Sequence, residues 1–102
     1  MMKRKPTSPG EILYEEFLLP LQITQKELAN HIGCDYKVIN RIINEKTRVS
    51  ADMALKLSLS FETTPDFWLN AQQAVDLWIS SKKHYKTSSI LRQHRRQRRA
   101  KI

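Results

Sequence analysis

Apolar residues recur at helical spacing in five segments of the chain, and each segment begins with a residue that favours a helix N-terminus. Ser8 and Thr24 open the first two segments, and each is followed three positions later by a glutamate, the capping-box arrangement. Asp35, Ser50 and Thr64 open the other three. The pattern predicts an all-α domain of five helices.

The sequence also indicates where these helices end. Pro20 is expected to end the first helix, because proline lacks an N–H group and disfavours helical backbone in the residue before it. Gly33 is expected to close the second helix in a left-handed conformation. The fifth helix can run from Thr64 to about Lys82. Two glycines and four prolines in 102 residues also argue against a turn-rich all-β fold.

The second and third segments, about residues 24–44, have the spacing of a helix-turn-helix. Ala29 is small where the third helix would cross closely, and Gly33 permits a tight turn. Apolar residues at the other positions would fill the angle between the two helices: Leu28, Ile32, Cys34, Ile39 and Ile42. The alternative is a purely structural helical hairpin, but matching all these positions within five capped helices favours the helix-turn-helix.

The outer face of the third helix is the candidate for reading DNA in the major groove. Arg41 suits the O6 and N7 acceptors of guanine, and Asn40 suits the N6 and N7 groups of adenine. Together with Lys37, these two are the leading candidates for contacts with base edges. The complete outward set is Tyr36, Lys37, Asn40, Arg41 and Asn44.

Four further residues are candidates for contacts with the DNA backbone. Gln25 and Lys26 open the second helix, whose N-terminal amides favour a phosphate. Lys46 and Arg48 follow the third helix and can reach phosphates beside it. Each residue alone could be an ordinary solvated side chain. As a set they more strongly indicate DNA contacts, because no acid occurs from Tyr36 to Asn44.

Three stretches of the chain carry a resemblance to a known family: PGEILYEEFLLPLQITQKELA, INRIINEKTRVSADMALKLS and TTPDFWLNAQQAVDL. From Ser8 to about Leu77 the sequence resembles the HigA-type (VapI-like) antitoxins of the lambda-repressor-like, or XRE, helix-turn-helix group. The resemblance implies a dimer that binds a palindromic operator in its own promoter and represses it. It also implies that the protein neutralises HigB, a RelE-like toxin that cleaves messenger RNA.

The fifth segment, about residues 64–82, carries apolar residues on more than one side. A helix of this kind is usually buried on two sides. One side would pack on the domain, and a second copy of the chain or the folded-back tail would cover the other. The resemblance implies that this helix contributes to a homodimer. The interface candidates are Phe67, Trp68, Leu69, Val75 and Trp78. The two tryptophans are interpreted as core or interface anchors rather than as nucleotide-stacking residues.

The charge is concentrated at the C-terminal end. The chain holds 18 Lys and Arg against 10 Asp and Glu, and nine of the cations, with no acid, follow Ser81. We therefore divide the chain into a helix-turn-helix domain (residues 1–82) and a basic tail (residues 83–102), in which a short helix can start near Ile90. Such a tail suggests a polyanionic partner, although a solvated chain end is the alternative. Because the resemblance implies a basic toxin, DNA phosphate is the simpler partner for the tail.

Several classes of function are not expected. Cys34 is the single cysteine, which suits a reducing cytoplasm, and no apolar run is long enough to span a membrane. The three histidines lack the ligand spacing of a zinc site. No phosphate-binding loop or catalytic arrangement is present, so neither an enzyme nor a cofactor is predicted. Two alternatives stay open: a stand-alone repressor without a toxin, and an RNA-associated protein acting through its Arg-rich tail.

Overall fold

The computed structural model describes residues 4–83 and Leu91, and in this part of the chain every regular element is helical. The elements are α1 (Pro9–Ile12), η1 (Leu13–Leu18), α2 (Leu19–Leu21), α3 (Gln25–Ile32), α4 (Tyr36–Ile43), α5 (Ala51–Phe61) and α6 (Pro65–Ser81). Because α1, η1 and α2 run on as one helical segment, the predicted all-α fold of five helices is confirmed. None of these helices is long and apolar enough to cross a membrane.

The first helical segment continues past Pro20, so the prediction that Pro20 ends it was wrong. Ahead of the proline the segment widens into the π-helix η1, in which the Leu19 N–H donates to the carbonyl of Tyr14, five residues back. A wider turn relieves the clash between a proline ring and the preceding helical turn. The chain leaves the helix only at Gln22, which has a left-handed φ of 56°.

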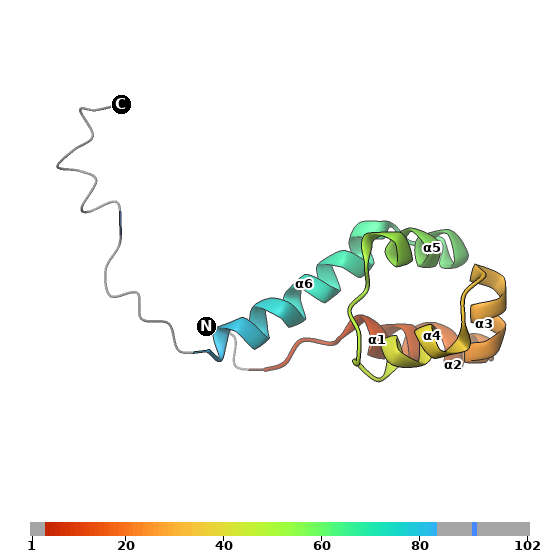
Figure 1. The fold of residues 1–102 in the computed structure, drawn as a ribbon, viewed down its shortest axis with the longest axis horizontal. Coiled ribbons are helices and arrows are strands. Elements are labelled where there is room, and N and C mark those ends of the chain that lie inside the picture. The colour runs from red at the N-terminus through yellow and green to blue at the C-terminus, as the bar shows by residue number, and fades with distance from the viewer. Residues whose placement is uncertain (1–3, 84–90, 92–102) are drawn as a thin grey trace, which may run out of the picture.

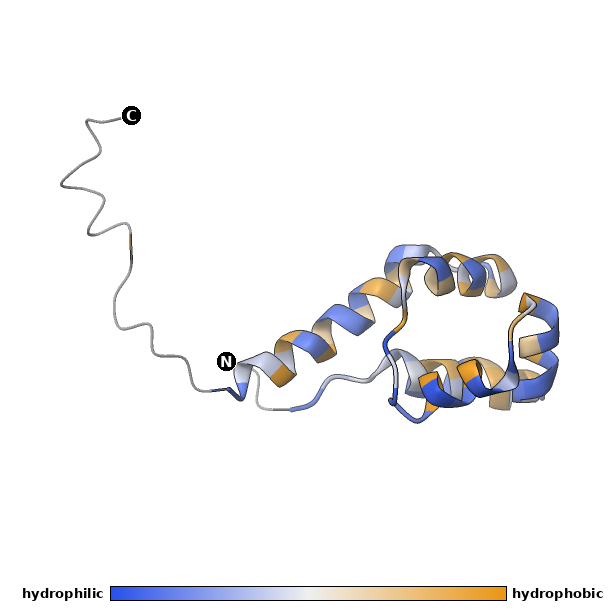
Figure 2. Cartoon of the chain, viewed as in Figure 1, coloured by the Kyte–Doolittle hydropathy of each residue, from blue (hydrophilic) through white to orange (hydrophobic). Residues whose placement is uncertain are grey.

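The helices enclose one apolar core. In Figure 1, α1, α2 and α4 lie at the bottom of the body, α5 lies above them, and α3 closes one end. Leu13, Ile39, Leu57 and Trp68 are fully buried between these layers. From the α5–α6 corner, α6 runs back along the molecule, and apolar residues alternate with polar ones along its whole length (Figure 2).

The start of α1 touches the end of α4 backbone to backbone. A Cβ atom built on Gly10 would lie 2.0 Å from the carbonyl oxygen of Ile42 and 2.9 Å from the Cα of Ile43. Only glycine therefore permits this approach. The contact sets the position of α4 from its inner side and leaves its opposite face free.

Candidate nucleic-acid interface

Local hydrogen bonds fix the ends of α3 and α4. The Glu27 N–H donates to Thr24 Oγ1 at 3.0 Å, and the Thr24 N–H donates to Glu27 Oε1 at 2.8 Å, which completes the predicted capping box. These bonds with Thr24 lower the pKa of the Glu27 carboxyl. Gly33 closes α3 with a φ of 88°, and Asp35 caps α4 by accepting the Lys37 N–H at 2.8 Å.

The angle between α3 and α4 is filled as the spacing predicts. Leu28, Ala29, Ile39 and Ile42 are buried there. Cys34 is half-buried at the turn, and burial raises the pKa of its thiol. A protonated, partly covered thiol is a poor nucleophile, which agrees with its interpretation as a small apolar residue of the turn.

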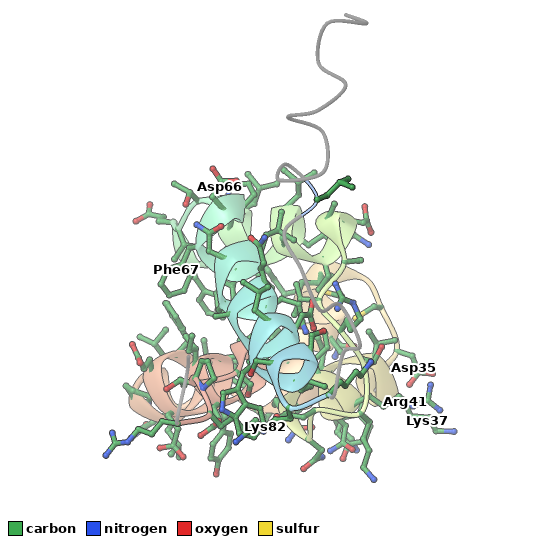
Figure 3. The ribbon with its side chains drawn as sticks, turned by 90° about the vertical axis from the view of Figure 1, so that its left-hand side faces the viewer. Asp35, Lys37, Arg41, Asp66, Phe67 and Lys82 are labelled. Atoms are coloured by element: carbon green, nitrogen blue, oxygen red, sulfur yellow. The ribbon has the colours of Figure 1, made fainter. Side chains whose placement is uncertain are left out.

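The outer face of α4 is open to solvent. Tyr36, Lys37 and Arg41 are exposed on it. Figure 3 shows Lys37 and Arg41 projecting from one side of the molecule, while Asp66 and Phe67 lie on the other. Lys26 joins this face from α3, with its Nζ 6.0 Å from the centre of the Tyr36 ring. We call this surface, with Asn40 and Asn44, the α4 face.

The amide side chains of the α4 face are linked to one another and to α3. Asn40 Nδ2 donates to Gln25 Oε1 at 3.0 Å, and Asn44 Nδ2 donates to the main-chain oxygen of Asn40 at 2.9 Å. Asn40 is half-buried, whereas Arg41 is exposed. These bonds hold the amides in place and leave Asn40 with less free hydrogen-bonding capacity than Arg41. The sequence did not indicate them, because they depend on how α3 approaches α4.

The two predicted backbone-contact residues after α4 lie in the loop of residues 44–50, and both are exposed. Lys46 forms no ion pair within the described part of the chain, whereas Arg48 pairs with Asp76 of α6. Glu45, in the same loop, has a left-handed φ of 57° and pairs with Lys5. The sequence therefore identified Lys46 and Arg48, but it did not indicate that Asp76 pairs with Arg48.

The structure divides the predicted dimer residues between core and surface. Trp68 and Val75 are buried within the single chain, so their side chains offer almost no area to a second copy. Phe67 is 40% exposed, and Leu69 and Trp78 are half-buried. Leu77 and Ile79, which the sequence analysis did not single out, are also exposed on α6. The dimer prediction therefore depends on these more exposed residues.

Apart from Lys83 and Leu91, which are both exposed, the basic tail and its predicted short helix lie outside the described residues. His84 and His94 lie outside them as well. The continuous described segment ends at Lys83, just after α6. In Figures 1 and 3, this end of α6 lies on the same lower side of the molecule as α4.

Comparison with known proteins agrees with this geometry. The profile of the helix-turn-helix family matches residues 15–68. An uncharacterised HTH-type transcriptional regulator of Haemophilus influenzae is 49% identical over 78 residues, 76% of this chain and 73% of that protein. Antitoxin HigA-1 of Vibrio cholerae is 39% identical over 90 residues, 88% of this chain and 85% of that protein. The structure of Pseudomonas aeruginosa antitoxin HigA with the higBA promoter aligns with a TM-score of 0.71 at 37% identity, covering 74% of this chain and 82% of that one. The resemblance predicted from the sequence motifs is confirmed.

Proposed function

The chain belongs to the helix-turn-helix family, in the branch of the HigA-type antitoxins, and from that premise we propose that it is a dimeric, operator-binding repressor that also neutralises a toxin. The relatives are transcriptional regulators and antitoxins, and the family is not one of enzymes. The proposed site of action is the cytoplasm, where operator DNA is present.

One observation carries the DNA-binding part of the proposal: the α4 face is cationic and open, whereas the opposite side of α4 is packed into the core. Lys37 and Arg41 are exposed on this face, while Ile39 and Ile42 are buried behind it. A helix presented in this way fits the major groove of DNA. The solved HigA structure with promoter DNA supports the same role for this chain.

We assign the two kinds of DNA contact to different parts of this surface. Arg41 and Lys37 read base edges. Asn40 and Asn44 complete the base-reading set and stay hydrogen-bonded to each other. Tyr36 contacts a thymine methyl group or a phosphate. Phosphate contacts come from both ends of the helix pair: Gln25, Lys26, Lys46 and Arg48.

Replacing Arg41 with alanine is expected to weaken operator binding by roughly 1–3 kcal/mol and to relax specificity at one base pair. The reason is that alanine cannot make the bidentate hydrogen bonds that arginine makes with guanine. The measurement is a binding titration on operator duplexes that carry each base in turn. An equal weakening on operator and on random DNA would instead make Arg41 a phosphate contact.

The dimer part of the proposal uses the exposed apolar residues of α6. Phe67 lies on the side of the molecule away from Lys37 and Arg41, so a second copy or a toxin can cover it without covering the α4 face (Figure 3). A two-fold dimer places two α4 helices on half-sites about one helical turn, ~34 Å, apart. Dimerisation doubles the contact surface, which a single module needs for tight binding.

The basic tail is the second phosphate-binding element of the proposal. Deleting the residues after Lys83 is expected to reduce the salt dependence of DNA binding by about 0.9 in log–log slope for each phosphate that the tail neutralises. The measurement is the operator dissociation constant at several salt concentrations. An unchanged slope would rule out a role of the tail on DNA, and preference for structured RNA over duplex DNA at matched salt would favour the RNA-associated alternative.

The toxin part of the proposal is tested by co-expression with the neighbouring reading frame, which should encode a small basic ribonuclease. The expected result is rescue of growth together with co-purification of the two proteins. Operator binding without rescue or co-purification would favour the stand-alone repressor. The resemblance to the antitoxin HigA-1 supports the first outcome.

A further inference from the structure

A chain of hydrogen bonds ties the loop after α4 to α6. The Val49 N–H donates to Gln72 Oε1 at 3.0 Å, and Gln72 Nε2 donates to Asp76 Oδ1 at 3.1 Å. The other carboxylate oxygen of Asp76 pairs with Arg48 Nη1. We call these four residues the loop clamp. The clamp starts at Val49 and ends at Arg48 of the loop, and its two middle residues, Gln72 and Asp76, lie one turn apart on α6.

The inner part of the loop clamp is shielded from water. Gln72 is 9% exposed and Val49 is 3% exposed. A buried main-chain N–H without a partner is unfavourable, so the Gln72 amide is needed where it lies. Next to the clamp is a cavity of about 270 Å³, open to solvent, between the start of α1, the loop and α6. The hydrogen bonds of the clamp fix the Arg48–Val49 end of the loop against α6.

The Arg48 side chain, at the solvent-exposed end of the loop clamp, is accessible to a ligand. The Arg48 side chain is 67% exposed even though it pairs with Asp76. A guanidinium group has five N–H donors, and the pair with Asp76 uses one nitrogen, Nη1. Lys46, two residues earlier, is exposed as well. The clamp therefore orders the Arg48 side chain and leaves most of its N–H donors free.

We infer that Gln72 and Asp76 are positioning residues for DNA binding, which hold the free N–H groups of Arg48 where they reach phosphates beside α4. The inference rests on the proposed function and deepens it. It gives α6 an indirect part in DNA binding, through the loop, although α6 does not itself lie on the α4 face. An acidic residue, Asp76, thereby assists binding to a polyanion.

The Asp76→Asn variant distinguishes a positioning role of Asp76 from a purely electrostatic effect of its negative charge. Removal of a negative charge near DNA should by itself tighten binding and steepen the salt dependence. If Asp76 positions Arg48, the variant instead binds operator DNA more weakly, by about three- to tenfold, and its salt slope does not rise. Tighter binding with a steeper slope would overturn the inference.

Gln72→Met tests the buried half of the loop clamp in a double-mutant cycle with Arg48→Ala. Methionine matches the length of glutamine but cannot bind the Val49 N–H or Asp76. We expect weaker operator binding in the wild-type background and a much smaller effect in the Arg48→Ala background, because the positioned contact is already absent. Additive effects would overturn the inference. Circular dichroism at the assay temperature establishes that each variant is folded.

Gln73→Met provides the matched control, since Gln73 is the exposed neighbour of Gln72 on α6 and lies outside the loop clamp. The probe is a duplex of the promoter region upstream of the coding sequence, compared with a random duplex. If the wild-type protein does not prefer the promoter duplex, or Arg41→Ala has no effect, the proposed function fails. If Arg41→Ala weakens binding but the Asp76 and Gln72 variants do not, only the clamp inference is overturned.

Discussion

Replacing Trp68 with alanine is expected to lower the free energy of unfolding by about 3–5 kcal/mol, the usual cost of removing a large buried aromatic side chain. Trp68 is fully buried, its ring centroid lies 5.5 Å from that of Phe17, and its Nε1 donates to Thr63 Oγ1 at 2.7 Å. The change leaves a cavity between the first helical segment and the α5–α6 corner. For a domain of this size the decrease is a large part of the total stability. Urea unfolding followed by circular dichroism measures it.

Phe67→Ala is the matched control for Trp68→Ala. Phe67 is adjacent on α6 and packs edge-on against Trp68, with ring centroids 5.1 Å apart, but it is 40% exposed. We expect its replacement to cost about 1 kcal/mol or less at protein concentrations where the chain is monomeric. A similar destabilisation by both variants would contradict the placement of Trp68 as the central core residue. A dependence of the Phe67→Ala effect on protein concentration would support a dimer contact there.

Replacing Gly10 with alanine is expected to destabilise the protein by about 1–3 kcal/mol or more, although alanine ordinarily favours a helix. The added methyl group would meet the backbone of Ile42 and Ile43, which no side-chain rotation can move away. Because these residues belong to α4, the helix must shift, and operator affinity should fall together with stability. Chemical denaturation and an operator titration on the same variant measure the two effects.

Gly33→Ala is the comparison for Gly10→Ala. Among the described residues no atom lies within 4 Å of a Cβ atom built at Gly33, and only its φ of +88° disfavours a side chain. We expect a cost of roughly 1–2 kcal/mol from the left-handed backbone, with α4 itself little displaced. If Gly10→Ala proved neutral or stabilising, the close approach of α1 to α4 would be refuted.

Helix starts and the main turn were predictable because their signals act over a few residues. Thr24 and Glu27 satisfy each other within the first turn of α3, and Gly33 adopts its conformation without help from distant residues. The outward-facing residues of α4 were predictable as well, because the positions of Ile39 and Ile42 in a helix determine which side faces the core. The error at Pro20 also has a local cause: the π-helical register of η1 is not apparent from residue preferences.

The sequence by itself determined the helices, the corner between α3 and α4, and the open cationic side of α4, because hydrogen bonds and periodicity within a turn or two encode them. Only the tertiary structure decided the partners across the fold: Gln25 with Asn40, Arg48 with Asp76, and Val49 with Gln72 are separated by 15, 28 and 23 positions. It also decided that Trp68 belongs to the core of one chain. These contacts depend on the angles and distances at which helices cross, and those are set by the packing of many side chains together.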